Sequence, residues 1–529
     1  MRTVGILGFL AALAVCALPG RGQGVVDDSE LVETRTEVPK LAPAAPYAMK
    51  DGVVEVELSE YAGYAGLIVA NGGLDASENS VFFRKHGFKV KLTLSEEESW
   101  SSLNAGRLAA SATTVDVLAV YGRQFQVQVP ALIGFSRGAD GIVVRSGIKR
   151  INDLRGKVLA SCQFTEADFF LRYLADEASI PVNMLPDLKA APDKGSVNVV
   201  YCADGFASGD LFLKDLAAGR DRLAGCVTWA PKTDEVVEAS EGKARLLVTN
   251  RNLLIVADIL AVNRGFADGS PEIVKGLVAG LLEGNALVRT EPDKHLPVIA
   301  KAFGWDLADA REELSKVHLA NFPENQAFFA GTIDSAGSYN GIYESAVMAY
   351  GSALVPNPTA SEKFFAKRYL SEIGESGAFK DQKASIQPEK SRGGGVVEGE
   401  PLLTKDIRFL FEANSAELDP GDPDIDEKLS TIRKMLQISP GSIVLLRGHV
   451  DNSKVEDFRR QGGDGYVRKQ AMRAIELSKQ RAMTVARRLT EQLGVDPERI
   501  EAIGRGWEEP LGSDAEQNRR VEVQWFTLE

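Results

Sequence analysis

Histidine and cysteine, from which many catalytic and metal sites are built, are scarce in this chain. Its 529 residues include only four of each. No Cys-x-x-Cys pair is present, so the sequence predicts no structural zinc site, and it indicates no cofactor. It also has no His-Glu-x-x-His pair and no P-loop. These absences argue against metalloprotease and nucleotide-hydrolase activity and favour a protein that binds rather than catalyses.

Blocks of basic residues are absent as well, and the formal net charge is −13. An acidic chain without a lysine or arginine cluster is not expected to bind nucleic acid. Of the four cysteines, Cys16 falls in the N-terminal segment, which leaves Cys162, Cys202 and Cys226. An odd number leaves one thiol unpaired, and spacing alone does not select a disulfide.

Long hydrophobic runs are missing too, and the longest candidate lies at the N-terminus. Met1-Arg2 precede an apolar run over residues 4–18, which is followed by small residues up to Gly22. The run is short for a membrane span, and its order is typical of an export signal. We expect residues 1–22 to be removed, with a single uncleaved anchor as the alternative.

Composition divides the rest of the chain into two ordered regions and two connecting segments. Residues 23–52 are mostly polar and hold three prolines, which predicts a flexible lead-in. Residues 379–402 contain Gly393-Gly394-Gly395 and several charged residues, which is typical of a linker. The ordered regions are therefore residues 53–378 and 403–529.

The first ordered region alternates between short apolar runs and amphipathic segments. Residues 53–58 and 158–161 have the apolar, β-branched character of strands, whereas residues 165–178 carry apolar side chains at helical spacing. From about residue 271 to residue 370 the pattern is helical. Strands separated by helices indicate an α/β fold with largely parallel sheets.

Five short phrases occur in order along this region. They are LNAGR at 103–107, TTVD at 113–116, SRGADGIV at 136–143, NDLRGK at 152–157 and TWAP at 228–231. Together they resemble the nitrate/sulfonate/taurine class of ABC-transporter substrate-binding proteins. The resemblance implies a bilobal periplasmic-binding-protein fold. Lobe one would comprise residues 53–147 and 252–378, and lobe two residues 148–251.

The resemblance also implies a small anionic solute in the cleft between the lobes, with an ABC permease as a further partner. In such folds ligands lie at the carboxyl ends of strands, near loops and helix N-termini. The polar side chains expected there are our candidate ligand-binding residues, Tyr64, Thr114, Ser136 and Thr165. Other roles stay open: Thr165 as a helix cap, Trp229 as core or cleft wall, and Arg137 as the partner of Asp140.

The second ordered region carries a different pattern, with a strand at 443–450 and an amphipathic helix at 473–492. Asp451 follows the strand. Arg481 is flanked at four residues on either side by apolar residues, so we expect it at the margin of the apolar face. A carboxylate and a guanidinium brought together there could hold a zwitterion. The carboxylate would take its ammonium group and the guanidinium its carboxylate.

Three motifs in this region resemble the OmpA-like peptidoglycan-binding domain. They are Gly-His-Val-Asp at 448–451, Leu-Ser-Lys-Gln-Arg-Ala at 477–482 and Asn-Arg-Arg-Val at 518–521. The resemblance covers residues 403–529 and implies an α+β domain of βαβαββ order. It implies further that Asp451 and Arg481 bind the diaminopimelate of the peptidoglycan stem. The alternative is that Asp451 caps a turn and Arg481 makes a surface ion pair.

The sequence departs from that family's pattern in places. Val450 replaces the usual threonine, and Ala474 replaces the asparagine that usually stands three residues before the Leu-Ser pair. The interval between Asp451 and Leu477 is long and holds the glycine-bearing run 461–465. We expect these changes to alter the rim of the binding pocket rather than the fold.

Together these patterns predict a solute-binding or sensing protein of the Gram-negative periplasm, attached to peptidoglycan and with outer-membrane association as an option. We expect no enzymatic activity. Two alternatives remain. One is a cell-envelope scaffold whose lobes dock a partner protein, and the other is an enzyme that uses Cys162 or Cys202 in the cleft.

Overall fold

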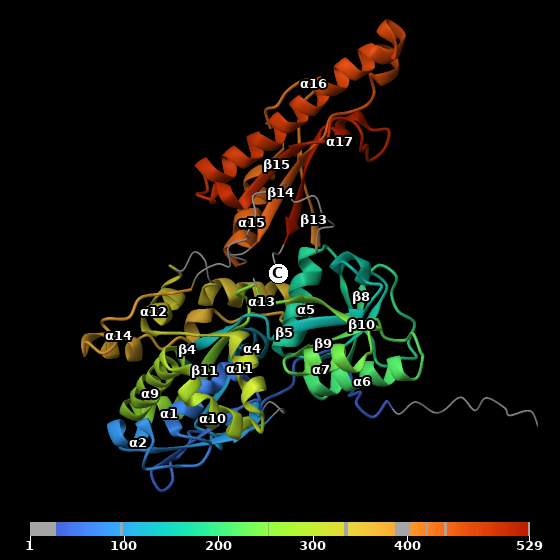
Figure 1. The fold of residues 1–529 in the computed structure, drawn as a ribbon. Helices are drawn as coiled ribbons and strands as arrows, with labels where there is room; N and C mark the ends of the chain where they lie inside the picture. The colour runs from blue at the N-terminus through green and yellow to red at the C-terminus, as the bar shows by residue number, and fades with distance from the viewer. Residues whose placement is uncertain are drawn as a thin grey trace, which may run out of the picture.

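In a computed structural model, the chain forms two α/β lobes followed by a smaller C-terminal domain (Figure 1). The structure describes residues 28–95, 99–251, 253–332, 337–386, 403–418, 422–438 and 442–526. The expected signal segment and residues 387–402 of the expected linker lie outside this part of the chain. Within it, no helix is both long enough and apolar enough to cross a membrane.

The first lobe is built on a six-stranded sheet. Its strands lie in the order β12 (Val317–Leu319), β4 (Val127–Ser136), β11 (Ala257–Asn263), β3 (Ala110–Thr114), β1 (Val53–Leu58) and β2 (Lys89–Leu94). β1 runs parallel to β2 and β3, whereas β11 pairs antiparallel with β3 and β4. β4 and β11 are buried along their whole length and mostly apolar, as expected of strands covered on both faces.

The second lobe has its own six-stranded sheet. Its strands lie in the order β10 (Ala244–Thr249), β5 (Asp140–Arg145), β9 (Gly225–Trp229), β6 (Val158–Cys162), β8 (Val197–Cys202) and β7 (Val182–Met184). β5 pairs with β9 and β10, so the chain enters this lobe at Asp140, ahead of the expected boundary at residue 148. The predicted bilobal α/β fold is confirmed.

Two chain crossings connect the lobes, between β4 and β5 and between β10 and β11. Asn250 ties the crossings together, since its Nδ2 donates to Asp140 Oδ2 at 2.9 Å and its Oδ1 accepts from the Gly138 N–H at 2.8 Å. Its own N–H donates to the Asp140 carbonyl at 3.0 Å. This network fixes the backbone where the two sheets meet.

Helices cover both sheets. The first lobe holds α1 (Ala65–Asn71), α2 (Val81–His86), α3 (Trp100–Asn104), α4 (Val115–Tyr121), α8 (Arg264–Gly269), α9 (Pro271–Thr290), α10 (Pro292–Phe303), α11 (Leu307–Ser315), α12 (Phe322–Ala330), α13 (Tyr339–Leu354) and α14 (Arg368–Glu375). The second holds α5 (Glu166–Glu177), α6 (Gly205–Ala217) and α7 (Lys232–Ala239). Short 3-10 turns are η1 (Ala62–Tyr64), η2 (Gly122–Gln124), η3 (Ile151–Leu154) and η4 (Ser361–Lys363).

The contact between α1 and α9 holds η1, and with it Tyr64, in place. A Cβ on Gly284 of α9 would lie 1.9 Å from the Gly66 carbonyl oxygen of α1. The helices therefore touch backbone to backbone, which only glycine permits at this point.

The lead-in that we expected to be flexible instead lies along both lobes over residues 28–47. On lobe two, Asp28 pairs with Arg222 at 3.0 Å, and Val32 N–H donates to the Tyr201 carbonyl at 2.9 Å. On lobe one, Tyr47 N–H donates to Asn263 Oδ1 at 3.1 Å. Specific side-chain partners outweigh the polar composition here, and the segment bridges the two lobes.

The expected linker also begins later than its composition suggests. Residues 379–386 pack on lobe one, where Ser385 N–H donates to Glu324 Oε1 at 2.8 Å and Asn321 Nδ2 donates to the Lys383 carbonyl at 2.7 Å. Glu324 has its pKa lowered to about 2, because hydrogen bonds and the nearby His318 outweigh the burial that alone would raise it.

The C-terminal domain has a four-stranded sheet. Its strands lie in the order β13 (Leu403–Leu410), β16 (Arg520–Phe526), β14 (Ile443–Gly448) and β15 (Ile500–Gly504). Its helices are α15 (Ile425–Ile438), α16 (Val455–Glu491) and α17 (Ala515–Asn518), with a 3-10 turn η5 (Pro497–Arg499). The strands and long helices follow the predicted βαβαββ order, so the predicted α+β class is confirmed.

Helix α16 is much longer than the predicted helix at 473–492. The glycine-bearing run 461–465 lies inside it, with non-helical backbone angles at Gly462 and Gly463 that mark a kink. All of its buried residues lie from Ala474 onward. Its first half therefore extends away from the sheet, as Figure 1 shows.

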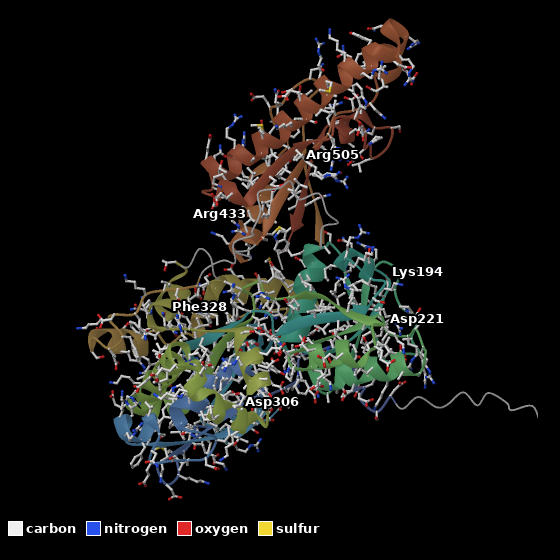
Figure 2. The ribbon with its side chains drawn as sticks, in the orientation of Figure 1. Lys194, Asp221, Asp306, Phe328, Arg433 and Arg505 are labelled. Atoms are coloured by element: carbon white, nitrogen blue, oxygen red, sulfur yellow. The ribbon has the colours of Figure 1, made fainter. Side chains whose placement is uncertain are left out.

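Charged side chains cover the outside of all three parts (Figure 2). Lys194 and Asp221 are exposed on lobe two, whereas Phe328 is buried in lobe one. Cys162, Cys202 and Cys226 are all buried, and none of the three forms a disulfide. Burial raises the pKa of the Cys202 thiol to about 12, so this cysteine is a poor nucleophile.

Candidate functional site

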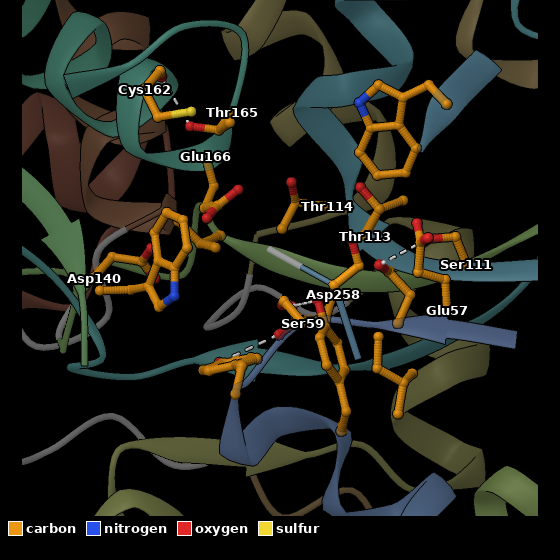
Figure 3. Close-up of a pocket in the computed structure, with 18 residues that line it drawn as sticks. Glu57, Ser59, Ser111, Thr113, Thr114, Asp140, Cys162, Thr165, Glu166 and Asp258 are labelled. Atoms are coloured by element: carbon orange, nitrogen blue, oxygen red, sulfur yellow. Dashed lines mark hydrogen bonds between the residues drawn. The ribbon is translucent and has the colours of Figure 1, made fainter. Parts of the chain in front are cut away.

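A cavity lies between the two lobes, beside the chain crossings (Figure 3). It encloses about 670 Å³ of empty space, counting its open mouth. Lobe one supplies Glu57, Ser59, Tyr61, Tyr64, Trp100, Thr113, Thr114 and Asp258, and lobe two supplies Asp140, Cys162, Thr165, Glu166 and Trp229. Ligand sites in proteins lie preferentially at junctions of this kind between two lobes.

Strand register brings the lining residues together. Asp258 of β11 stands opposite Thr114 of β3, and Asp140 of β5 stands opposite Trp229 of β9. Each pair joins a carboxyl group to a neighbour on the adjacent strand of its own sheet. The crossings then place the two pairs on facing sides of one cavity.

Three of the four predicted ligand-binding residues line this cavity: Tyr64, Thr114 and Thr165. Ser136 does not; it ends β4 and is 1% exposed. Thr165 stands at the N-cap position of α5, but its hydroxyl makes no capping bond and donates instead to the Cys162 carbonyl at 3.0 Å. Trp229 is a wall of the cavity as well as a buried residue.

Ser136 is also the centre of a Gly-x-Ser-x-Gly sequence at residues 134–138. In α/β-hydrolases this spacing places a serine nucleophile on a sharp turn between a strand and a helix. Here the pentapeptide leaves β4 and enters the crossing to strand β5. The hydroxyl of Ser136 is buried, and no histidine is among the described lining residues of the nearby cavity. The motif therefore lacks the turn and the base of a nucleophile elbow.

The lining gives no support to the predicted anionic solute. Among the described residues that line the cavity, none is lysine, arginine or histidine. Arg137 is not part of the lining. Instead Glu57, Asp140, Glu166 and Asp258 contribute carboxyl groups, and Figure 3 shows them around one space.

Burial shifts the acid–base properties of this region. Desolvation is the largest cause at each of three carboxyl groups; it raises the pKa of Asp116 to about 7 and that of Asp140 to about 6. The pKa of Asp258 is raised well above its usual range, and the nearby Asp140 raises it further. Hydrogen bonds to these groups only partly oppose the shifts. These carboxyl groups therefore keep their protons to a higher pH than exposed carboxyl groups do.

Two tyrosines hold Asp258 from the side of η1. Tyr64 donates its hydroxyl to Asp258 Oδ1 at 3.2 Å, and Tyr61 donates to Oδ2 at 3.4 Å. Burial raises the pKa of both phenols well above the usual value, so they remain hydrogen-bond donors. The two rings meet edge to face, with centroids 5.2 Å apart.

Sequence reasoning missed Asp140, Asp258, Glu57 and Tyr61 as lining residues. A signal was present at two of them, since Asp140 falls in a recognised phrase and Asp258 opens an apolar strand. A single acidic residue at the start of such a strand can be either a turn residue or a binding-site residue. Only the arrangement of the two lobes distinguishes these roles.

Cys162 lines the cavity, and its thiol donates to the Ala203 carbonyl at 3.4 Å. Among the described residues, no group of histidine, cysteine and acidic side chains is arranged to hold a metal ion.

In the C-terminal domain, Asp451 follows β14 and is partly exposed. Its Oδ1 accepts hydrogen bonds from the N–H and the hydroxyl of Ser453. It therefore caps a turn, as one of the alternatives supposed. Within the described part of the chain its Oδ2 makes no hydrogen bond, and this oxygen can accept one from a ligand.

Arg481 does not lie at the margin of the helix face, as we expected; it is fully buried at 0% exposure. Its Nε, Nη1 and Nη2 donate to the carbonyls of Ser415, His449 and Glu412 at 2.8, 2.9 and 2.8 Å. The guanidinium also lies 5.3 Å from the centroid of the Phe411 ring. The physical reason is that three carbonyls without strand partners converge on this point, and a guanidinium can serve all three.

Two charged residues near Arg481, Arg519 and Asp451, affect its pKa. Burial lowers the pKa of Arg481 to about 10, Arg519 lowers it further, and Asp451 opposes the shift. The group therefore keeps its positive charge at neutral pH. Asp451, Arg481 and Arg519 form one charged cluster at the end of β14.

Arg519, which sequence reasoning did not single out, is the partly exposed cation of this cluster. Its Nε donates to the Phe411 carbonyl at 3.1 Å. Within the described part of the chain, its two terminal nitrogens have no acceptor, so they are free to meet a carboxylate. The Asn-Arg-Arg-Val motif was the available signal, since it places two arginines where β16 begins.

His449 and Arg520, which lie next to this cluster in the sequence, both contact Glu522. His449 is 1% exposed, and its Nε2 lies 3.5 Å from Glu522 Oε2. Burial alone would raise the pKa of Glu522, but His449 and Arg520 together bring it to about 2. The carboxylate of Glu522 is thus ionised, and Arg520 pairs with it at 2.6 Å.

Residues 410–524 match the model of the OmpA family. The C-terminal domain is an OmpA domain. This match spans less than a quarter of the chain and says nothing of the two lobes. No curated protein sequence matches this chain.

Solved structures resemble the two lobes. One is the periplasmic aliphatic sulphonate binding protein SsuA from Escherichia coli, with 15% identity, TM-score 0.46, and coverage of 60% of this chain and 93% of that one. The alkanesulfonate-binding protein SsuA from Xanthomonas axonopodis pv. citri has 14% identity, TM-score 0.44, and coverage of 60% and 100%. The nitrate-binding protein NrtA from Synechocystis PCC 6803 has 11% identity, TM-score 0.44, and coverage of 61% and 89%.

Proposed function

We propose that this protein binds a small solute between its two lobes and is attached to peptidoglycan by its OmpA domain. It would work in the periplasm as a solute-binding or sensing protein, with an ABC permease as a candidate partner. The observation that carries the proposal is the combination in one chain of an interlobe cavity and an OmpA domain in which Asp451 and Arg519 are partly exposed.

For the wall site we propose recognition of diaminopimelate, whose side chain ends in a zwitterion. Asp451 would accept a hydrogen bond from the ammonium group through Oδ2. The carboxylate would be bound by the outer nitrogens of Arg519, with the buried charge of Arg481 behind it. A bidentate contact of this kind is among the stronger charged hydrogen bonds.

For the lobes we propose reversible solute binding by closure around the cavity. The crossings and the residue 28–47 segment link the lobes, so opening would be a hinge motion with small amplitude at Asn250. The lining offers carboxyl, hydroxyl and aromatic groups, which bind and orient a solute without a covalent step.

The Asp451→Ala variant tests the wall site. We expect its affinity for purified sacculi to fall by at least about tenfold, which corresponds to about 1.4 kcal/mol, because one charged hydrogen bond is lost. Co-sedimentation of the full-length chain with sacculi measures this.

Glu491→Ala is the matched control, because it removes an exposed acid ten residues beyond Arg481 on the same helix, about 15 Å away. We expect it to bind sacculi like the parent protein. Unchanged binding by Asp451→Ala would rule out the proposed attachment through this residue.

A scaffold that docks a partner protein through its lobes is the competing proposal. It predicts that no small molecule stabilises the lobes, whereas a solute at 100 times its dissociation constant would add about 2.7 kcal/mol to the free energy of unfolding. The experiment that closes the next subsection separates the two.

A further inference from the structure

The interlobe cavity gathers the carboxyl groups of Glu57, Asp140, Glu166 and Asp258, and no lysine, arginine or histidine is among its described lining residues. Desolvation is the largest cause that raises the pKa of both Asp140 and Asp258, and the charges of Asp140 and Asp116 raise that of Asp258 further. Asp140 and Asp258 are 3% and 2% exposed. Buried charges in proteins are normally paired or neutralised. Each of these carboxyl groups is therefore stabilised either by a proton or by a positively charged partner.

Aromatic rings surround the same space. Tyr61, Tyr64, Trp100 and Trp229 all line the cavity. The face of an aromatic ring attracts a cation, most strongly for tryptophan, and the attraction grows when water is excluded. Carboxyl groups framed by aromatic rings are the chemistry that recognises alkylammonium compounds.

A buried polar atom of the lining has no hydrogen-bond partner among the described residues. It is Trp229 Nε1, whose residue is 7% exposed. An indole N–H donates only, so it needs an acceptor. Orphaned groups of this kind in a cavity indicate contact with a ligand or water.

We propose that the cavity binds a small organic cation, with its ammonium group between Asp140 and Asp258, its alkyl part against Tyr64 and Trp229, and a hydrogen-bond acceptor facing Trp229 Nε1. The inference rests on the proposed solute-binding function and names its ligand class. It replaces the anion that the resemblance to sulfonate-binding and nitrate-binding proteins suggested.

The test compares ligands that differ in charge and little in shape. Choline, its neutral isostere 3,3-dimethylbutan-1-ol and the anion isethionate share a two-carbon chain with a polar end. Ethanolamine, putrescine and phenethylamine extend the ammonium series to other sizes. Each is added to the full-length chain, and thermal unfolding and calorimetric titration are measured.

We expect at least one ammonium compound to stabilise the lobes and to bind at least about tenfold more tightly than its neutral counterpart. Asp258→Asn, which keeps the shape and removes the charge, should abolish that preference. Trp229→Phe should weaken binding while leaving the preference for positive charge. Asp309→Asn, an exposed acid on α11, is the matched control and should change neither.

Stabilisation by isethionate and by no ammonium compound would overturn the inference and leave the solute-binding function standing. Stabilisation by neither series would overturn both and favour the scaffold. Ammonium binding that survives Asp258→Asn unchanged would place the ligand elsewhere and also refute the assignment.

Discussion

Replacing Arg481 by alanine lowers the free energy of unfolding of the OmpA domain by at least about 3 kcal/mol. The carbonyls of Ser415, His449 and Glu412 each lose a charged donor in a buried place. A buried acceptor without a partner costs about 1–3 kcal/mol, and three lose theirs at once. Hydrogen exchange of peptides from β14 and α16, measured on the full-length chain, should report the loss of protection directly.

Two variants sharpen this result. Arg481→Lys keeps a charge but cannot span three carbonyls, so it should recover only part of the protection. Arg487→Ala removes an exposed arginine from the same helix and should stay within about 0.5 kcal/mol of the parent protein. If Arg481→Ala keeps its protection and loses only sacculus binding, then Arg481 contacts the wall directly and its structural role is refuted.

This expectation changes how sacculus binding is interpreted. Asp451→Ala and Arg481→Ala should both weaken binding, but only the second should loosen the domain. Hydrogen exchange separates a lost ligand contact from a lost fold, which binding alone does not.

The second large effect concerns pH. Burial raises the pKa of Asp116 to about 7, against an ordinary value of 3.8 in the unfolded chain. Below about pH 4 the group is protonated in both states. Between about pH 4 and pH 7 the folded chain keeps a proton on Asp116 that the unfolded chain has lost. The free energy of unfolding of the lobes therefore decreases as pH rises through this window.

Asp116→Asn should therefore stabilise the lobes at pH 8 by up to about 4 kcal/mol and leave them unchanged near pH 4. Urea unfolding at both pH values measures the difference. Four other ionisable groups interact with Asp116, and their protonation still depends on pH in the variant. They are Asp140, Asp168, Asp258 and Tyr350. Asp309→Asn, on the surface, should show no such difference between pH 4 and pH 8.

A lower stability of Asp116→Asn at pH 8 would mean that the ionised carboxylate is held by the fold. That result would contradict the raised pKa and the account of the acidic region built on it.

The amino-acid sequence alone was sufficient to predict the architecture. Alternating apolar runs and amphipathic segments gave the α/β lobes, and three motifs gave the OmpA domain, because hydrophobic period and local phrases are properties of neighbouring residues. It also pointed to Tyr64, Thr114 and Thr165, which line the interlobe cavity, and their binding of a ligand stays a prediction.

Other features were decided by contacts between distant segments. The lead-in was expected to be flexible, yet Asp28 and Tyr47 find partners near residues 222 and 263. The glycine-bearing run was expected to lie in a polar interval, yet it continues a helix through a kink at Gly462 and Gly463. The composition of a segment gives no information about its contacts with distant parts of the chain.

What the sequence determined about this protein is therefore its set of modules and the order in which they occur. What only the tertiary structure decided is the charge of each site. Arg481 is buried because three carbonyls from separate segments converge on it, and the cleft is acidic because strand pairing and two chain crossings bring Asp140 and Asp258 together. Charge at a site depends on which groups meet in space, and groups more than a hundred residues apart meet only through the fold.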